Sequence, residues 1–160
     1  MSPDPLRGRI FQINVSKGGV PKLAIPVGEV TLQGVAGDQQ SDLKVHGGPD
    51  RAMCLYSLEL LMALQAEGHP TYPGAFGENL TLSGLKWEQV EPGQRYRLGP
   101  EVLVEITRYT NPCNNLTPFF AAGEYGRISQ SQRPGWSRVY ARVLVGGRLR
   151  PGDEIIQVLG

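Results

Sequence analysis

Cysteine and histidine are scarce in this chain, which has two of each among its 160 residues. The two cysteines, Cys54 and Cys113, are too few for a disulfide framework and lack the CxxC spacing of zinc and iron–sulfur sites. The two histidines, His46 and His69, are not spaced as a metal-binding pair. We therefore expect a reducing compartment and a cytoplasmic protein.

Long apolar runs and an excess of one charge are also missing. No run approaches the roughly 20 apolar residues of a membrane span, and the first nine residues have no signal-peptide apolar region. Sixteen Lys and Arg against fifteen Asp and Glu leave a net charge of +1. No overall field attracts nucleic acid or an anionic membrane surface, so we expect neither as a partner. Any anion site must be local.

Turn-forming residues are abundant, with 21 glycines and 13 prolines. The apolar segments between them are short and several alternate with period two, which predicts strands. The predicted strands are 8–16, 23–32, 52–56, 80–82, 94–98, 102–109, 138–145 and 154–159. In the first of them, Phe11, Ile13 and Val15 are predicted to share a face. Cys54 lies within an apolar strand, so packing is its simplest explanation.

One well-formed helix is predicted, with Ser57 as its N-cap and Gly68 as its end. Leu58, Leu61 and Met62 are its expected apolar stripe. A short helical turn is expected after Thr117. Residues 34–38 are predicted to be a loop, in which Asp38 could cap, bind backbone amides or, most simply, face water.

These elements indicate a mainly β protein, with about eight strands and one helix. A closed barrel is favoured because it leaves no sheet edge unpaired. The length suits one domain over residues 1–160, with its core at about 8–158.

Cys113 is the residue that most needs an explanation. It lies in the polar loop Asn111-Pro112-Cys113-Asn114-Asn115, directly after a strand. A cysteine that only fills a core has apolar neighbours, so this loop indicates an accessible thiol. A nearby cation or metal would favour its thiolate, and the candidate cations are Lys44, His46, Arg51, Arg108 and Arg138.

Two further patterns stay open between a functional and an ordinary role. Lys44-Val45-His46-Gly47-Gly48 joins an imidazole to two glycines that can present backbone N–H groups to an anion, or it is a plain turn. Arg138, Tyr140, Arg142 and Leu144 share one face of a predicted strand, which could bind phosphate or simply be solvated.

Several segments, taken together in their order, resemble the MOSC family, the domain named after the C-terminal part of molybdenum cofactor sulfurases. The matching segments are 34–38 (GVAGD), 46–52 (HGGPDRA), 73–80 (PGAFGENL), 112–113 (PC), 134–136 (PGW), 138–139 (RV) and 152–153 (GD). The resemblance extends over roughly Gly8 to Val158 and is greatest to the small stand-alone bacterial members.

The resemblance implies a closed β-barrel associated with the molybdenum cofactor, a pterin dithiolene that carries molybdenum and a phosphate. It identifies Cys113 as the motif cysteine, which is the catalytic residue and metal ligand in reductase members and handles sulfur in sulfurases. The implied cofactor-binding residues are Lys44, His46, Gly47, Gly48, Asp50, Arg51, Glu78, Asn79 and Arg138. Pyridoxal phosphate is not expected, because it belongs to a desulfurase domain.

The chain departs from the common family pattern beside the cysteine. Many relatives have a basic residue next to the Pro-Cys pair, whereas asparagines flank it here. Binding of the cofactor phosphate would then fall to Arg138, Arg51 or Lys44.

Three functions are compatible with these observations. The first is an enzyme that reduces N-hydroxylated bases or related N–O compounds, with electrons from partner proteins. The second is a carrier that passes the cofactor, or sulfur as a Cys113 persulfide, to a recipient protein. The third is a thiol enzyme that uses Cys113 and His46 without molybdenum.

Overall fold

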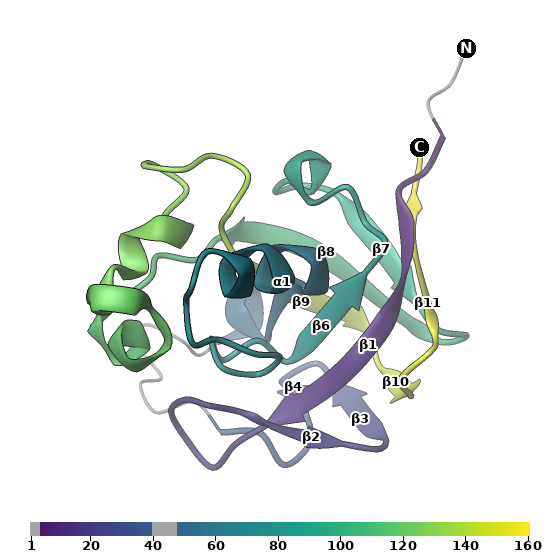
Figure 1. The fold of residues 1–160 in the computed structure, drawn as a ribbon. Coiled ribbons are helices and arrows are strands. Elements are labelled where there is room, and N and C mark those ends of the chain that lie inside the picture. The colour runs from purple at the N-terminus through teal and green to yellow at the C-terminus, as the bar shows by residue number, and fades with distance from the viewer. Residues whose placement is uncertain (1–3, 40–47) are drawn as a thin grey trace.

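Seven strands close into a barrel in this computed structural model, which describes residues 4–39 and 48–160 (Figure 1). Around the barrel the order is β1 (Arg7–Val15), β11 (Glu154–Val158), β7 (Arg95–Leu98), β8 (Val102–Tyr109), β9 (Val139–Val145), β5 (Met53–Ser57) and β6 (Leu80–Ser83), which pairs with β1 again. The short strand β2 (Leu23–Ile25) extends the sheet beside β1. The predicted closed barrel is confirmed.

A second, three-stranded sheet consists of β10 (Gly147–Leu149), β3 (Gly28–Thr31) and β4 (Gly34–Val35). The predicted strand 23–32 is thus two strands in two sheets. The prediction of a loop over 34–38 was wrong for its first two residues, because Val35 pairs with Val30 and is buried. Gly34 permits this close packing, since a Cβ there would lie 2.3 Å from the Ala52 carbonyl oxygen.

The predicted face of the first strand was also wrong, because β1 contains a bulge. Its register against β6 shifts between Ile10 and Gln12. A bulge places one extra residue on a strand and interrupts the period-two alternation. Ile10 and Ile13 are therefore both buried, while Phe11 is 48% exposed.

Among the described residues β5 and β6 form the one parallel pair in the barrel, and α1 (Leu58–Ala66) makes the crossover between them. Ser57 is the N-cap as predicted, and its hydroxyl accepts a hydrogen bond from Leu60 N at 3.2 Å. The buried stripe differs from the prediction. Leu61 and Leu64 are buried, whereas Met62 is 57% exposed.

Replacing Ser57 with alanine should lower the free energy of unfolding by about 1 kcal/mol, because the helix loses its capping acceptor. Chemical denaturation would measure this loss. Ser57→Thr keeps the hydroxyl and is the control. Equal stabilities of the alanine and threonine variants would contradict the capping role.

The remaining helical segments are 3₁₀ turns: η1 (Pro49–Arg51), η2 (Trp87–Gln89), η3 (Asn114–Phe119), η4 (Ala121–Gly123) and η5 (Tyr125–Ile128). The first of them after the predicted start of the cysteine loop is η3, and Phe119 at its end and Phe120 before η4 belong to the core. Phe120 stacks on Phe76 with ring centroids 5.0 Å apart. These contacts fix the chain on the C-terminal side of Cys113.

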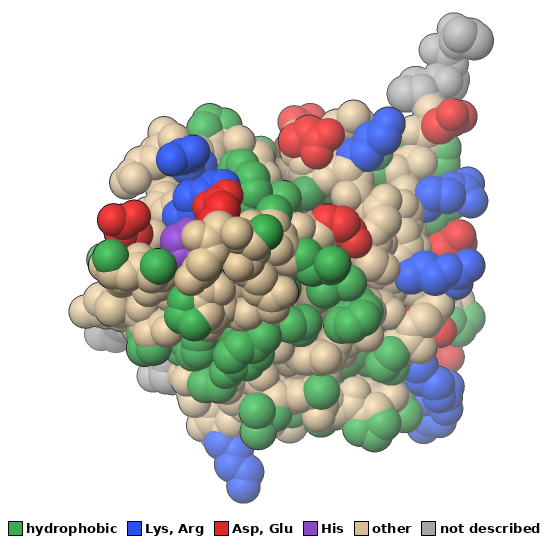
Figure 2. Space-filling view, viewed as in Figure 1, with side chains coloured by type: hydrophobic (Ala, Val, Ile, Leu, Met, Phe, Trp, Pro, Cys, Tyr) green, Lys and Arg blue, Asp and Glu red, His purple; other side chains and the backbone are tan. Residues whose placement is uncertain are grey.

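Acidic and basic side chains are interspersed on the side of the molecule where β1, β7 and β11 lie (Figure 2). Arg7 pairs with Glu154 across β1 and β11, and Arg95 pairs with Glu105 across β7 and β8. These pairs are largely exposed and contribute little to stability. Within residues 4–39 and 48–160, no helix is long and apolar enough to cross a membrane.

Candidate functional site

A pocket lies against one face of the strand pair β5 and β9. Cys54 of β5 and Tyr140 of β9 are direct partners across the two strands, so their side chains point to the same side. Val139 and Ala141 alternate with Tyr140 and are buried on the opposite side. The pocket, a cavity of about 60 Å³, occupies the side that carries Cys54 and Tyr140.

Four of the predicted site residues come together in the lining of this pocket: Arg51, Asn79, Cys113 and Arg138. They come from η1, from the turn before β6, from the start of η3 and from the residue before β9. More than 60 residues of sequence separate the first from the third. The fold brings them together because β5, β6, β8 and β9 lie on the same part of the barrel.

Cys113 is half-buried at the N-cap position of η3, with extended backbone angles. Its Sγ lies 2.6 Å from Asn115 Oδ1, so the thiol donates a hydrogen bond to that amide oxygen. Asn115 and Leu116 also line the pocket. The sulfur is thus held at the pocket wall.

Arg138 is a buried cation that ties two loops together. It is 6% exposed, and it donates from Nη1 to the Phe76 carbonyl at 2.7 Å and from Nη2 to the Asn111 carbonyl at 3.3 Å. Its Nε is buried and has no hydrogen-bond partner among the described residues. The guanidinium therefore fixes the cysteine loop against the turn at 74–79.

Arg51 and Tyr140 form the side of the pocket nearest η1. The Arg51 guanidinium lies 5.8 Å from the centroid of the Tyr140 ring, a distance at which a cation and an aromatic face attract each other. Burial raises the pKa of Tyr140 to about 12, so its hydroxyl stays protonated at neutral pH. Tyr140 presents a neutral phenol to the pocket.

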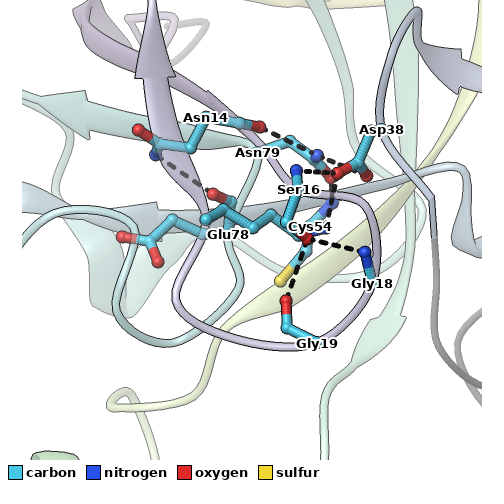
Figure 3. A network of polar contacts seen from close by, with 9 residues as sticks. Asn14, Ser16, Gly18, Gly19, Asp38, Cys54, Glu78 and Asn79 are labelled. Atoms are coloured by element: carbon cyan, nitrogen blue, oxygen red, sulfur yellow. Dashed lines mark hydrogen bonds and ion pairs between the residues drawn. The ribbon is translucent and has the colours of Figure 1, made fainter.

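A buried polar network centred on Asp38 supports another part of the pocket wall, at Asn79 and Cys54 (Figure 3). Asp38 Oδ1 accepts hydrogen bonds from Ser16 N at 2.9 Å and from Lys22 Nζ at 2.6 Å, and Oδ2 accepts one from Asn79 Nδ2 at 2.9 Å. The side chains of Lys22 and Asp38 are 8% and 3% exposed. The expectation that Asp38 faces water was wrong.

Asn79 extends this network to the barrel wall. Its Oδ1 accepts a hydrogen bond from Cys54 N at 3.0 Å, and its own N–H donates to the Cys54 carbonyl at 2.7 Å. Nδ2 also donates to the Asn14 carbonyl. The side-chain amide of Asn79 is therefore committed to protein partners, and its role in the pocket is to hold the wall in place.

Glu78 does not line the pocket, and its contact with a cofactor stays a prediction. It is fully buried, and its Oε2 accepts hydrogen bonds from Gly74 N and Thr81 Oγ1, both at 3.1 Å. Burial raises the pKa of Glu78 to about 7. Its side chain holds the 74–79 turn from behind.

The predicted loop at 44–51 is only partly described. Lys44, His46 and Gly47 lie outside the described residues. Asp50 is exposed, forms an ion pair with Arg142 and does not line the pocket, and neither does Gly48. Of the described part of this loop, Arg51 alone contributes a side chain to the pocket lining.

Among the lining residues that sequence reasoning did not single out as site residues are Lys22, Cys54 and Tyr140. Tyr140 follows Arg138 by two positions on the same face, so the alternation could have indicated it. Cys54 was explained by packing. It is buried, and burial raises the pKa of its thiol to about 11, yet its side chain borders the pocket. No sequence signal joined Lys22 to Asp38.

Comparison with known proteins identifies related sequences and a similar fold. The family model described as the MOSC domain matches residues 42–156. YflK, an uncharacterised protein of Bacillus subtilis, is 39% identical over 74% of this chain, and a protein named Reductase from Gibberella moniliformis is 34% identical over 96% of it. The crystal structure of YiiM from Geobacillus stearothermophilus superimposes with a TM-score of 0.73 at 29% identity, covering 95% of this chain and 75% of that one.

This chain spans 53% of the length of YflK and 30% of the length of the Gibberella protein. On the extent of the family match and on the identity to YflK, the chain belongs to the MOSC domain family.

Proposed function

We propose that this domain binds the molybdenum cofactor in the pocket, with the Cys113 thiolate as the protein ligand of the metal. MOSC domains are associated with this cofactor in general. The observation that carries the proposal is the position of Cys113, whose loop places it in a cationic pocket beside Arg51 and Arg138. A soft thiolate is a suitable ligand for molybdenum.

The residues present fit one end of such a cofactor. A cavity of about 60 Å³ holds a few water-sized groups, so it admits the metal end and leaves the pterin near the surface. Within the described residues, no three His, Cys, Asp or Glu side chains are grouped to hold a bare metal ion. One protein sulfur is sufficient for a metal that already carries dithiolene ligands.

The roles of the chain's own residues follow from their contacts. Cys113 would hold the metal, and Arg51 and Arg138 would attract the anionic cofactor. Asn79 and Asp38 would keep the wall in position. Lys44, His46, Gly47 and Gly48 remain predicted cofactor contacts. When bound, the cofactor supplies two-electron redox chemistry.

As an enzyme, the domain would reduce an N-hydroxylated base or a related N–O compound. The N–O bond breaks, two electrons and two protons are taken up, and the products are the amine and water. Partner proteins would supply the electrons. The name of the Gibberella relative supports a reductase, and a Cys113→Ser variant that binds the cofactor and keeps full reductase activity would refute it.

The alternative is a carrier that delivers the cofactor, or sulfur as a Cys113 persulfide, to a recipient protein. The half-buried position of Cys113 in a surface loop favours it, because a cargo on that sulfur stays reachable by a partner. Protein without either bound pterin or labile sulfur after purification from a cofactor-producing host would refute the carrier.

Replacing Cys113 with alanine should reduce co-purified molybdenum at least tenfold, because the only proposed protein ligand is lost. Elemental analysis and pterin fluorescence of protein from a cofactor-producing host would measure this. Cys54→Ala is the matched control, since it removes the other pocket thiol and should keep the metal. Equal molybdenum in the two variants would contradict the assignment of Cys113.

A further inference from the structure

One motif singled out in the sequence plays no part in the pocket that holds Cys113. It is Pro134-Gly135-Trp136, whose first two residues line a second cavity, of about 280 Å³. Trp87 and Glu88 of η2 and Tyr109 at the end of β8 are also in its lining. Among the described residues, the two cavities have no lining residue in common.

The walls of the second cavity are fixed by contacts within the protein. Gly135 has a φ of +90°, and its backbone N–H donates to Gln130 Oε1 at 3.2 Å, which closes the loop between them. A Cβ at Gly135 would lie 3.5 Å from Glu88 Cβ, so this loop reaches η2. Trp87 is 4% exposed, and its Nε1 donates to the Ser137 carbonyl at 2.8 Å. The cavity is therefore formed before a ligand arrives.

The lining combines aromatic rings with polar groups that are not used by the fold. Glu88 is exposed, and within the part of the chain that the structure describes its carboxylate forms no ion pair or hydrogen bond. The same holds for the hydroxyl of Tyr109, which is half-buried. Small-molecule sites typically have such apolar and aromatic walls with a few polar groups.

The charge of the lining favours a cation. Glu88 is a carboxylate, and no Lys or Arg is among the described lining residues. A carboxylate accepts charge-assisted hydrogen bonds from an ammonium group. Aromatic rings such as those of Trp87 and Tyr109 also attract organic cations.

We propose that this cavity binds a primary ammonium group carried on an apolar body. The ammonium donates to the Glu88 carboxylate, and the apolar body packs against Trp87 and Tyr109. The ammonium belongs either to a free arylalkylamine or to a lysine side chain of a partner peptide. The site goes beyond the proposed function, because it requires neither molybdenum nor the Cys113 sulfur.

Titration of the isotope-labelled protein with phenethylamine, followed by NMR at neutral pH and constant ionic strength, tests the site. We expect saturable shifts of the Trp87 indole N–H and the Gly135 backbone N–H, with one ligand bound per chain. Phenethyl alcohol has the same ring without the charge, and it should bind weaker by a factor of about three or more.

Two substitutions in the lining locate the ligand. Glu88→Gln should weaken phenethylamine binding by a factor of about three or more and leave the binding of phenethyl alcohol unchanged. Tyr109→Leu keeps apolar bulk without the ring and should weaken the binding of both ligands. Glu88→Gln decides the test if Tyr109→Leu does not fold.

Two matched controls lie outside the cavity lining. Glu91→Gln removes another exposed carboxylate and should bind phenethylamine as the wild type does. Cys113→Ser should also bind it unchanged, which separates this site from the proposed metal ligand. Tighter binding of phenethylamine than of acetyl-lysine amide would support the site for a free amine, and the reverse order would support it for a lysine side chain.

Absence of a saturable shift at Trp87 with both amines, or equal phenethylamine affinity in Glu88→Gln and the wild type, would overturn the proposal. Neither result would bear on molybdenum content, which the Cys113 variants measure separately.

Discussion

Replacing Asp38 with alanine is expected to lower the free energy of unfolding by about 3–5 kcal/mol, because it leaves a buried ammonium without its counter-charge. Lys22 Nζ lies 2.6 Å from Asp38 Oδ1, and both side chains are almost completely buried. The same substitution removes the acceptors of Ser16 N and Asn79 Nδ2. Denaturant unfolding monitored by tryptophan fluorescence would measure the loss.

Two comparisons identify the cause of that loss. In the double variant Lys22→Met, Asp38→Ala the unpaired ammonium is gone, so part of the stability should return. Glu29→Ala breaks the ion pair between Glu29 and Arg148, whose side chains are both more than half exposed, and should change stability by less than about 1 kcal/mol. An Asp38→Ala variant as stable as Glu29→Ala would show that the buried pair is unimportant.

The Glu78→Gln variant is expected to lose a pH dependence that the wild type has. Burial raises the pKa of Glu78 from 4.5 to about 7, so between these values the folded state holds a proton that the unfolded state has released. The contribution of Glu78 to the free energy of unfolding is therefore greatest below pH 4.5 and is lost as the pH rises through about 7. The shift in the pKa of Glu78 corresponds to a loss of roughly 3 kcal/mol in the free energy of unfolding over this pH range.

Glutamine stays neutral and can still accept from Gly74 N and Thr81 Oγ1. We expect the variant and the wild type to be similar at pH 4.5 and the variant to be more stable at pH 8. Denaturant unfolding at the two pH values measures the difference in the free energy of unfolding between the variant and the wild type. The other titrating groups are present in both proteins, so their contributions cancel in this difference. Glu88→Gln, at an exposed carboxylate, should show no such trend. If the difference in stability between the variant and the wild type did not change with pH, the pKa of Glu78 would not be raised in the folded state.

The fold was largely predictable because its signals are local. The alternation of Val102, Val104 and Ile106, the cap at Ser57 and the hairpin at Gly99 each act within a few residues, and each prediction is confirmed. The bulge in β1 was not predictable. It depends on how β6 pairs with Ile10 and Gln12, which β1 alone does not encode.

The site was predictable only where a motif marked it. Cys113, Arg51, Asn79 and Arg138 were singled out through the resemblance, and the fold brings them to one pocket. Glu78 was singled out in the same way but does not line this pocket. The side chain of Asn79 accepts from Cys54 N in the pocket wall, whereas that of Glu78 is buried and accepts from Gly74 N. The pairing of Lys22 with Asp38 is a tertiary contact without a sequence pattern.

Closure of the barrel has a consequence for synthesis on the ribosome. Strand β11 fills the gap between β1 and β7, and among the described residues it follows all the other barrel strands in the sequence. Until it emerges, both neighbours have an open edge that can pair with other nascent chains. Long-range pairing of this kind also slows folding. Chaperone protection of the nascent chain is therefore most valuable before β11 emerges, when every pocket residue has been made but the barrel cannot yet close.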